Sequence, residues 1–152
     1  MFSKSRNIST FATFVVIYFF PWIFYEFIAK NFFENQIIND VSRGNEMILW
    51  AVTVGCVIMA YLFSTIYEGW SKDEYSLSNG IRFGVLIGLF FGVGIGLVMY
   101  GTEFRMTHTA HIIDALFWVV IYSIAGIMAS AVYKRCHSSA NKKPRMSGVF
   151  DF

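Results

Sequence analysis

The stretch from Asn79 to Thr102 reads NGIRFGVLIGLFFGVGIGLVMYGT, and glycine recurs in it at every fourth position. The glycines in register are Gly80, Gly84, Gly88, Gly92 and Gly96. A glycine inside a helix costs about 1 kcal/mol relative to alanine in water. In a membrane, small residues let two helix backbones approach closely, and G-x-x-x-G is the recurrent pattern at such contacts. The stretch therefore predicts a membrane-spanning helix that packs through a row of glycines, a glycine zipper.

Uncharged segments of nearly equal length fill most of the 152-residue chain, which is 56% hydrophobic and 14% charged. They hold 19, 21, 20 and 19 residues and lie between Arg6 and Glu26, Glu46 and Glu68, Arg82 and Glu103, and Asp114 and Lys134. About 20 apolar residues in a helix cross a bilayer, whereas barrel strands alternate apolar and polar residues. The sequence predicts one all-α domain over residues 1–152, a four-transmembrane-helix bundle with spans near 8–28, 47–68, 82–102 and 112–133.

The first apolar segment follows Lys4 and Arg6, as it would in a signal peptide. The segment FATFVVIYFFPWIFYEF is longer and bulkier than the short apolar region of a signal peptide, so we expect it to be retained as a span. Pro21 lies inside this span, and proline removes a backbone hydrogen bond. We therefore expect a kink in the helix there.

Basic residues are concentrated in the segments that four spans place on one side of the membrane. The two terminal segments and the second loop hold 9 Lys and Arg residues, while Lys30, Arg43 and Arg105 make 3 on the other side. Because cytoplasmic segments carry the excess of Lys and Arg, both termini are predicted to be cytoplasmic. The cytoplasmic tail over 134–152 carries basic residues that can face anionic lipid, namely Lys134, Arg135, Lys142, Lys143 and Arg145.

The fourth span offers small residues to the glycine row of the third. Gly126 and Ser130 repeat its four-residue step. Each such step turns 400°, so successive glycines drift by about 40° around the helix and form a slanted groove. We expect the fourth span to fill this groove. A seam between copies of the chain and a docking face for another protein remain alternatives.

The spans carry ionisable residues only near their ends. Proton relays and ion-coupled transporters place such residues within the membrane, so this composition disfavours them. The sequence contains no phosphate-binding loop and no nucleophile elbow. We therefore expect a protein that is not an enzyme and has no cofactor.

A polar cluster is expected on the outer side of the membrane, from Glu26, Glu103, His108, His111 and Asp114. The last three are spaced by three residues and share one broad helix face. Imidazole and carboxylate suit zinc, copper or iron, although a metal site needs three or four converging ligands. A helix cap at Thr107 or Thr109, with the histidines at the headgroup level, explains the segment without a metal and is the preferred interpretation.

On the cytoplasmic side, Glu68 ends the second span and Arg82 begins the third. Only a short loop separates them, so we expect an ion pair across the two helices.

The segment Ile66–Val93, IYEGWSKDEYSLSNGIRFGVLIGLFFGV, joins an aromatic-acid-Gly helix end to an NG-x-RFG start of a glycine-rich helix. It resembles a group of uncharacterised bacterial four-helix inner-membrane proteins, a domain of unknown function, over spans two to four. This resemblance implies a location in the bacterial inner membrane and implies no activity.

Taken together, these patterns favour a small non-catalytic membrane protein, an accessory or assembly subunit of a membrane complex or a homo-oligomer. Its expected partners are the lipid bilayer and other membrane subunits or further copies, with no nucleic acid. The alternative is a small-solute channel or transporter with a path beside the third span and an entrance near Glu26, Glu103 and His108.

Overall fold

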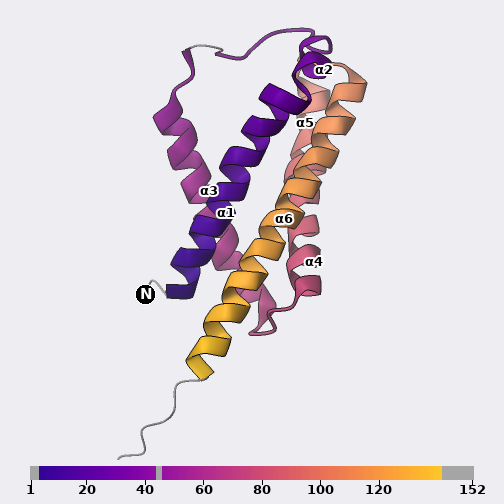
Figure 1. The fold of residues 1–152 in the computed structure, drawn as a ribbon. Coiled ribbons are helices and arrows are strands. Elements are labelled where there is room, and N and C mark those ends of the chain that lie inside the picture. The colour runs from indigo at the N-terminus through magenta and orange to yellow at the C-terminus, as the bar shows by residue number, and fades with distance from the viewer. Residues whose placement is uncertain (1–3, 44–45, 142–152) are drawn as a thin grey trace, which may run out of the picture.

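The computed structural model describes residues 4–43 and 46–141, which form a bundle of helices (Figure 1). The chain runs through α1 (Lys4–Ile23), the π-helical η1 (Phe24–Ile28), the short α2 (Lys30–Glu34), α3 (Leu49–Ser71), α4 (Leu77–Gly88), the π-helical η3 (Leu89–Ile95), α5 (Gly96–Thr102) and α6 (His108–Asn141). Four helices are long and apolar enough to cross a membrane, at Lys4–Ile28, Leu49–Ser71, Leu77–Thr102 and His108–Ser138. The prediction of an all-α, four-helix membrane bundle is confirmed.

The two ends of the bundle differ in what they hold. The start of α1, the turn at 72–76 and the end of α6 lie at one end, called here the tail end; α2 lies at the other, the α2 end (Figure 1). Helix α6 continues to Asn141 and so includes Lys134 and Arg135. Hydropathy marks where the membrane stops rather than where the helix stops, which is why the expected span ended earlier. The remaining basic tail residues Lys142, Lys143 and Arg145 lie outside the described residues.

A π-helical turn follows Pro21, which lies inside α1. The amide of Ala29 donates to the carbonyl oxygen of Phe24 at 2.8 Å, which is the five-residue spacing of a π-helix. Where a kink is expected, the structure shows a local widening of the helix after Pro21, and the chain continues in the same span to Ile28.

At its tail end, α4 lies backbone to backbone against α6. A Cβ atom built on Gly80 would lie 2.5 Å from the carbonyl oxygen of Gly126, and one built on Gly84 would lie 2.2 Å from that of Tyr122. The contact is mutual, since a Cβ atom on Gly126 would lie 2.1 Å from the carbonyl oxygen of Gly80. Only glycine fits at these three positions without a shift of the helices. Ser130 completes this end of the contact, and its hydroxyl donates to the carbonyl oxygen of Ser76 at 2.8 Å.

The same contact continues into η3. A Cβ atom on Gly88 would lie 2.6 Å from Cα of Val119, and one on Gly92 would lie 2.5 Å from the carbonyl oxygen of Ala115. The neighbour of these glycines is thus α6 of the same chain. We call the contact of Gly80, Gly84, Gly88 and Gly92 with α6 the glycine seam.

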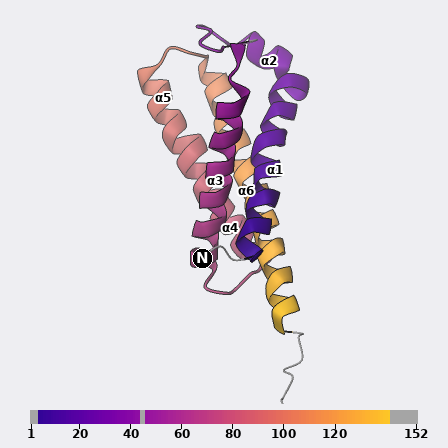
Figure 2. The ribbon, with the colours of Figure 1, turned by 90° about the vertical axis from the view of Figure 1, so that its left-hand side faces the viewer.

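Gly96 does not belong to the glycine seam. A Cβ atom built there would meet no atom within 4 Å. Toward the α2 end α5 leans away from α6 (Figure 2), and Gly96 lines a cavity between them. The fifth glycine keeps the sequence period of the first four, but the neighbouring helix has already diverged.

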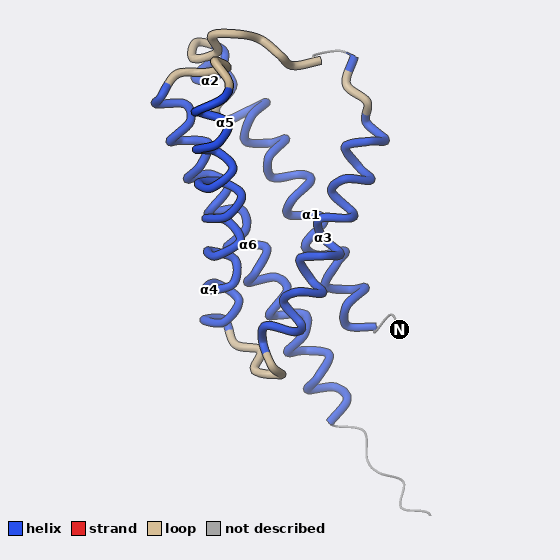
Figure 3. The backbone as a smooth tube through the Cα atoms, turned by 180° about the vertical axis from the view of Figure 1, so that it is seen from behind, coloured by secondary structure: helices blue, strands red, loops and turns tan. Residues whose placement is uncertain are grey.

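Helix α3 joins the bundle mainly through its half nearer the tail end. The ring of Phe63 contacts the ring of Phe83 with centroids 4.9 Å apart, and Tyr67 contacts both Phe83 and Tyr133, at 5.3 and 5.9 Å. Nearer the α2 end, α3 separates from α1 after the two helices cross (Figure 3). One half of α3 is therefore fixed by aromatic packing, and the other half leaves much of its apolar surface uncovered.

Candidate functional site

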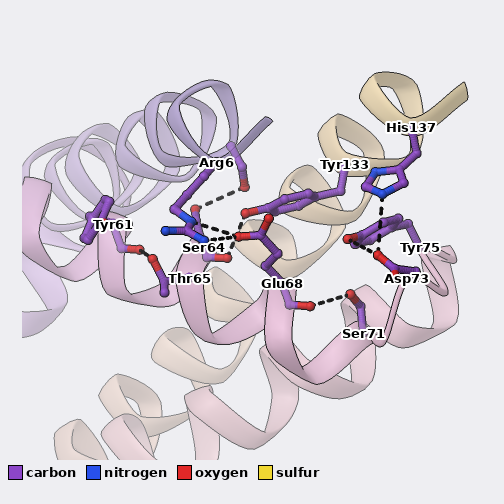
Figure 4. A network of polar contacts seen from close by, with 11 residues as sticks. Arg6, Tyr61, Ser64, Thr65, Glu68, Ser71, Asp73, Tyr75, Tyr133 and His137 are labelled. Carbon is purple, nitrogen blue, oxygen red and sulfur yellow. Dashed lines mark hydrogen bonds and ion pairs between the residues drawn. The ribbon is translucent and has the colours of Figure 1, made fainter. Parts of the chain in front are cut away.

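An ion pair between α1 and α3 is the centre of the polar network at the tail end (Figure 4). The Nη2 atom of Arg6 lies 2.6 Å from Oε2 of Glu68, and its Nε donates to the same oxygen at 2.8 Å. The two side chains are 22% and 25% exposed, so the pair is partly shielded from solvent. Its two nitrogen contacts to one carboxylate oxygen hold the ends of the two helices together.

Glu68 therefore has a different partner from the one we expected. Among the described residues it pairs with Arg6, and the side chain of Arg82 is exposed. Residue 82 lies about 200° around the helix from both Gly80 and Gly84. Because those two glycines face α6, the side chain of Arg82 points away from the bundle.

Hydroxyl groups extend this network into the bundle. The hydroxyl of Ser9 donates to that of Ser64 at 3.0 Å, and Tyr133 donates to the carbonyl oxygen of Ser64 at 3.0 Å. All three side chains are buried. They connect α1, α3 and α6 by neutral hydrogen bonds, as is usual for hydroxyls between membrane helices.

The turn between α3 and α4 adds an aromatic contact to the same end. Tyr75 stacks on Tyr133 with ring centroids 5.1 Å apart, and burial raises the pKa of the Tyr75 hydroxyl. The Oδ1 atom of Asp73 lies 3.4 Å from Nε2 of His137, but the Asp73 side chain is 82% exposed. A pair this exposed contributes little to stability. The tail-end network thus connects α1, α3, α6 and the turn before α4 through an ion pair, hydroxyl bonds and aromatic contacts.

At the α2 end, the expected ligands contact groups other than one another. Tyr25 donates to the carboxylate of Asp114, and His108 bonds through Nδ1 to the hydroxyl of Tyr100. Glu26 lies 3.7 Å from Nζ of Lys30. Within residues 4–43 and 46–141, no three His, Cys, Asp or Glu side chains are placed to hold a metal ion. Tyr25, Tyr100 and Lys30 thus contact three of the five expected ligands, Asp114, His108 and Glu26, and the described residues do not assemble the expected metal site.

Thr107 caps the first turn of α6. The amide of Ala110 donates to its Oγ1 at 3.4 Å, and its hydroxyl donates to the side-chain oxygen of Gln36. The backbone of Arg105 accepts bonds from the amides of Ile38 and Asn39, at 2.9 and 3.2 Å. The segment after α2 is thereby tied to the segment before α6.

Beneath this tied segment lies a cavity of about 630 Å³, called here the vestibule. Charged side chains from three parts of the chain line it: Glu26, Lys30, Glu34, Asp40, Arg105 and Asp114. Asp40 accepts a bond from the amide of Ser42 at 2.8 Å, and hydrogen bonding to Ser42 lowers the pKa of Asp40. Three aromatic rings share the lining: Tyr25, Phe33 and Trp118.

A second cavity, of about 610 Å³, lies between α5 and α6 and is called here the groove. Its lining is mostly apolar and includes Val93, Leu97, Ile112 and Leu116. Gly96 and His111 line both the groove and the vestibule. The sequence pointed to His108, His111 and Asp114 but missed the aromatic residues, whose place beside them follows only from the fold.

Comparison of the chain with protein-family models, with curated proteins and with solved structures found no match.

Proposed function

We propose that the protein is a non-catalytic assembly subunit of a membrane complex, and that the first contact in this complex is between α3 and the α3 of a second copy. The observation that carries this proposal is the uncovered face of α3. A Cβ atom built on Gly55 or on Gly69 would meet no atom within 4 Å, in contrast to the four glycines of the seam.

This face runs along most of the helix. Gly55, Leu62 and Gly69 are spaced by seven residues and so lie within about 40° of one another. Ile58, Leu62 and Ile66 are 53%, 50% and 53% exposed. The buried face of α3 is on the opposite side of the helix. We call this uncovered surface of Gly55, Ile58, Leu62, Ile66 and Gly69 the α3 face; its two glycines are about 21 Å apart along the axis.

Contacts among the described residues do not explain why Gly55 and Gly69 are glycines. Each glycine costs the helix about 1 kcal/mol relative to alanine, and packing among the described residues does not require either one. Close approach of another helix does require small residues. A spacing of seven residues suits a neighbour that crosses at a small left-handed angle, about +20°.

A second copy fits this face by symmetry. Two chains in one membrane share the same orientation, so a two-fold axis along the membrane normal would set Gly55 against Gly55 and Gly69 against Gly69. The face carries no charge, so such a contact brings no like charges together. The buried hydroxyls of Ser9 and Ser64 bond to each other, and this contact between α1 and α3 supports a structural role.

The setting inferred for this subunit is the bacterial inner membrane with both termini in the cytoplasm. The excess of Lys and Arg in the terminal segments and the 72–82 region supports this orientation. The start of α1 and the end of α6 lie at the same end of the bundle, which supports placing both termini on one side of the membrane (Figure 1).

The size of the particle in a mild detergent tests the proposal. The wild-type protein should have at least twice the protein mass of the 17.4 kDa chain. Gly55→Leu and Gly69→Leu, singly and together, should shift it toward the monomer because leucine separates the two helices. Gly101→Leu is the matched control, because Gly101 is equally open but lies on α5. A monomeric wild-type protein, or a double variant with the wild-type mass, would refute this proposal.

A small-solute channel or transporter is the competing candidate, and the polar vestibule is the observation that favours it. The groove beside the third span ends where the glycine seam begins. From Gly92 to Gly80 the backbones are in contact, which closes the route between α4 and α6 toward the tail end. Solute flux into vesicles that contain the monomeric double variant would favour the channel over the assembly subunit.

A further inference from the structure

The vestibule and the groove together have the form of a site for an amphiphile. The vestibule lies under the segments at the α2 end of the bundle, and the groove lies between two membrane-spanning helices. Gly96 and His111 line both, so the two cavities meet at these residues. Each has a volume within the roughly 300–1,000 Å³ usual for small-molecule sites.

The groove suits an apolar chain. Its lining includes Val93, Leu97, Ile112 and Leu116, and the last three of these side chains are exposed on the surface of the bundle. A surface of this kind within a bilayer lies against lipid tails. The groove is therefore accessible from the membrane to an acyl or alkyl chain.

The vestibule favours a cation. Four carboxylates and two basic groups, those of Lys30 and Arg105, line it. When all six are ionised, the net charge of the lining is 2 − 4 = −2. The carboxylates are those of Glu26, Glu34, Asp40 and Asp114. Beside them lie the rings of Tyr25, Phe33 and Trp118, and aromatic faces attract cations.

The junction of the two cavities, at Gly96 and His111, provides both an open passage and an unpaired polar atom. A Cβ atom on Gly96 would meet no atom within 4 Å, so nothing blocks this point. The Nε2 atom of His111 is buried and makes no hydrogen bond to the described residues. Buried polar atoms are almost always hydrogen-bonded. A ligand with N–H donors at this level would give Nε2 a partner.

We propose that the protein binds one primary-ammonium amphiphile, with the ammonium group in the vestibule and the apolar chain passing Gly96 into the groove. The ammonium donates to the carboxylates and to Nε2 of His111. A quaternary ammonium has no N–H to donate, and an anionic head is repelled by the net negative charge. Long-chain amines and amine-headed phospholipids of the leaflet at the α2 end share this chemistry.

Native mass spectrometry of the full chain, released from detergent, measures the binding directly. Titrations with dodecylammonium, dodecyltrimethylammonium and dodecyl sulfate should give a single saturable adduct for the first, with affinity about tenfold or more above the other two. Phosphatidylethanolamine and phosphatidylcholine form a second pair of probes. Preference for phosphatidylethanolamine identifies a bilayer lipid as the source, and binding of dodecylammonium alone identifies a free amine. Equal binding of all three dodecyl probes would refute the proposal.

Two variants locate the site. Gly96→Leu should weaken dodecylammonium binding about tenfold or more by filling the junction, while Gly101→Leu, on the same helix and equally open, should leave it within about twofold. Asp114→Asn keeps the shape of the vestibule and removes one charge, and it should narrow the preference for dodecylammonium over dodecyl sulfate. Unchanged binding in both Gly96→Leu and Asp114→Asn would place the ligand elsewhere and overturn the assignment.

Discussion

Replacing Gly84 by alanine adds one methyl group at the most tightly enclosed of the four glycines Gly80, Gly84, Gly88 and Gly92. The new Cβ atom would lie 2.2 Å from the carbonyl oxygen of Tyr122 and 2.6 Å from Cα of Ser123. Both are backbone atoms, so no side chain can rotate to make room. The two helices must instead move apart along the seam, and this loosens the contacts at Gly80 and Gly88 as well.

The size of the effect follows from two opposing contributions. Extra atoms in a well-packed interior cost typically 1–3 kcal/mol, and a clash with backbone on this scale lies near the upper value, about 3 kcal/mol. Alanine recovers about 1 kcal/mol of helix propensity. The net loss in the free energy of unfolding for Gly84→Ala is therefore about 2 kcal/mol.

Gly101→Ala is the matched control, since Gly101 also lies within a membrane-spanning helix but has open space around it. Its free energy of unfolding should stay the same or rise by up to about 1 kcal/mol. Both variants are unfolded in mixed micelles with increasing mole fraction of dodecyl sulfate, and helicity is followed by circular dichroism. Equal stability of the two variants would refute the backbone contact between α4 and α6.

Three further predictions concern the polar network and the orientation of the chain. Glu68→Gln should lower the free energy of unfolding by about 1–3 kcal/mol, a value between those of exposed and buried ion pairs. Arg82→Gln is the control and should leave the free energy of unfolding unchanged. Equal effects of the two substitutions in the same micelle assay would contradict the pairing of Glu68 with Arg6. A double-mutant cycle on Ser9→Ala and Ser64→Ala should give a coupling of about 0.6 kcal/mol, and a coupling of zero would show that the two hydroxyls do not bond. A reporter fused after the last residue should be cytoplasmic and one inserted near Asn39 external, and the reverse pattern would overturn the orientation.

The spans could be predicted from the sequence because their signal is local. A helix in lipid satisfies its own backbone hydrogen bonds, so an apolar run of sufficient length is enough to identify it. The pairing of α4 with α6 could also be predicted from the sequence. Both helices carry small residues at the same four-residue step, around Gly84 and Gly126, and few other segments could approach either one as closely.

What the sequence did not predict depends on distant parts of the chain. Arg6 is 62 residues from its partner Glu68, and Tyr25 is 89 residues from Asp114. Each pairing follows from which helix ends meet, and a composition count cannot show this. The expectation that Gly96 packs against the neighbouring helix was wrong for a related reason. The four-residue period describes one helix and cannot show where the neighbouring helix diverges from it.

Cysteine cross-linking at Leu62 tests most directly whether the α3 face joins two copies. In a chain with Cys56 and Cys136 replaced by alanine, Leu62→Cys is compared in native membranes with Leu86→Cys, at a site on α4 of similar exposure, 50% against 48%. Mild oxidation should convert the Leu62→Cys protein into a disulfide-linked dimer and leave the Leu86→Cys protein monomeric. A Leu62→Cys protein that stays monomeric, or dimerises no faster than the Leu86→Cys protein, would contradict the assembly of copies through α3.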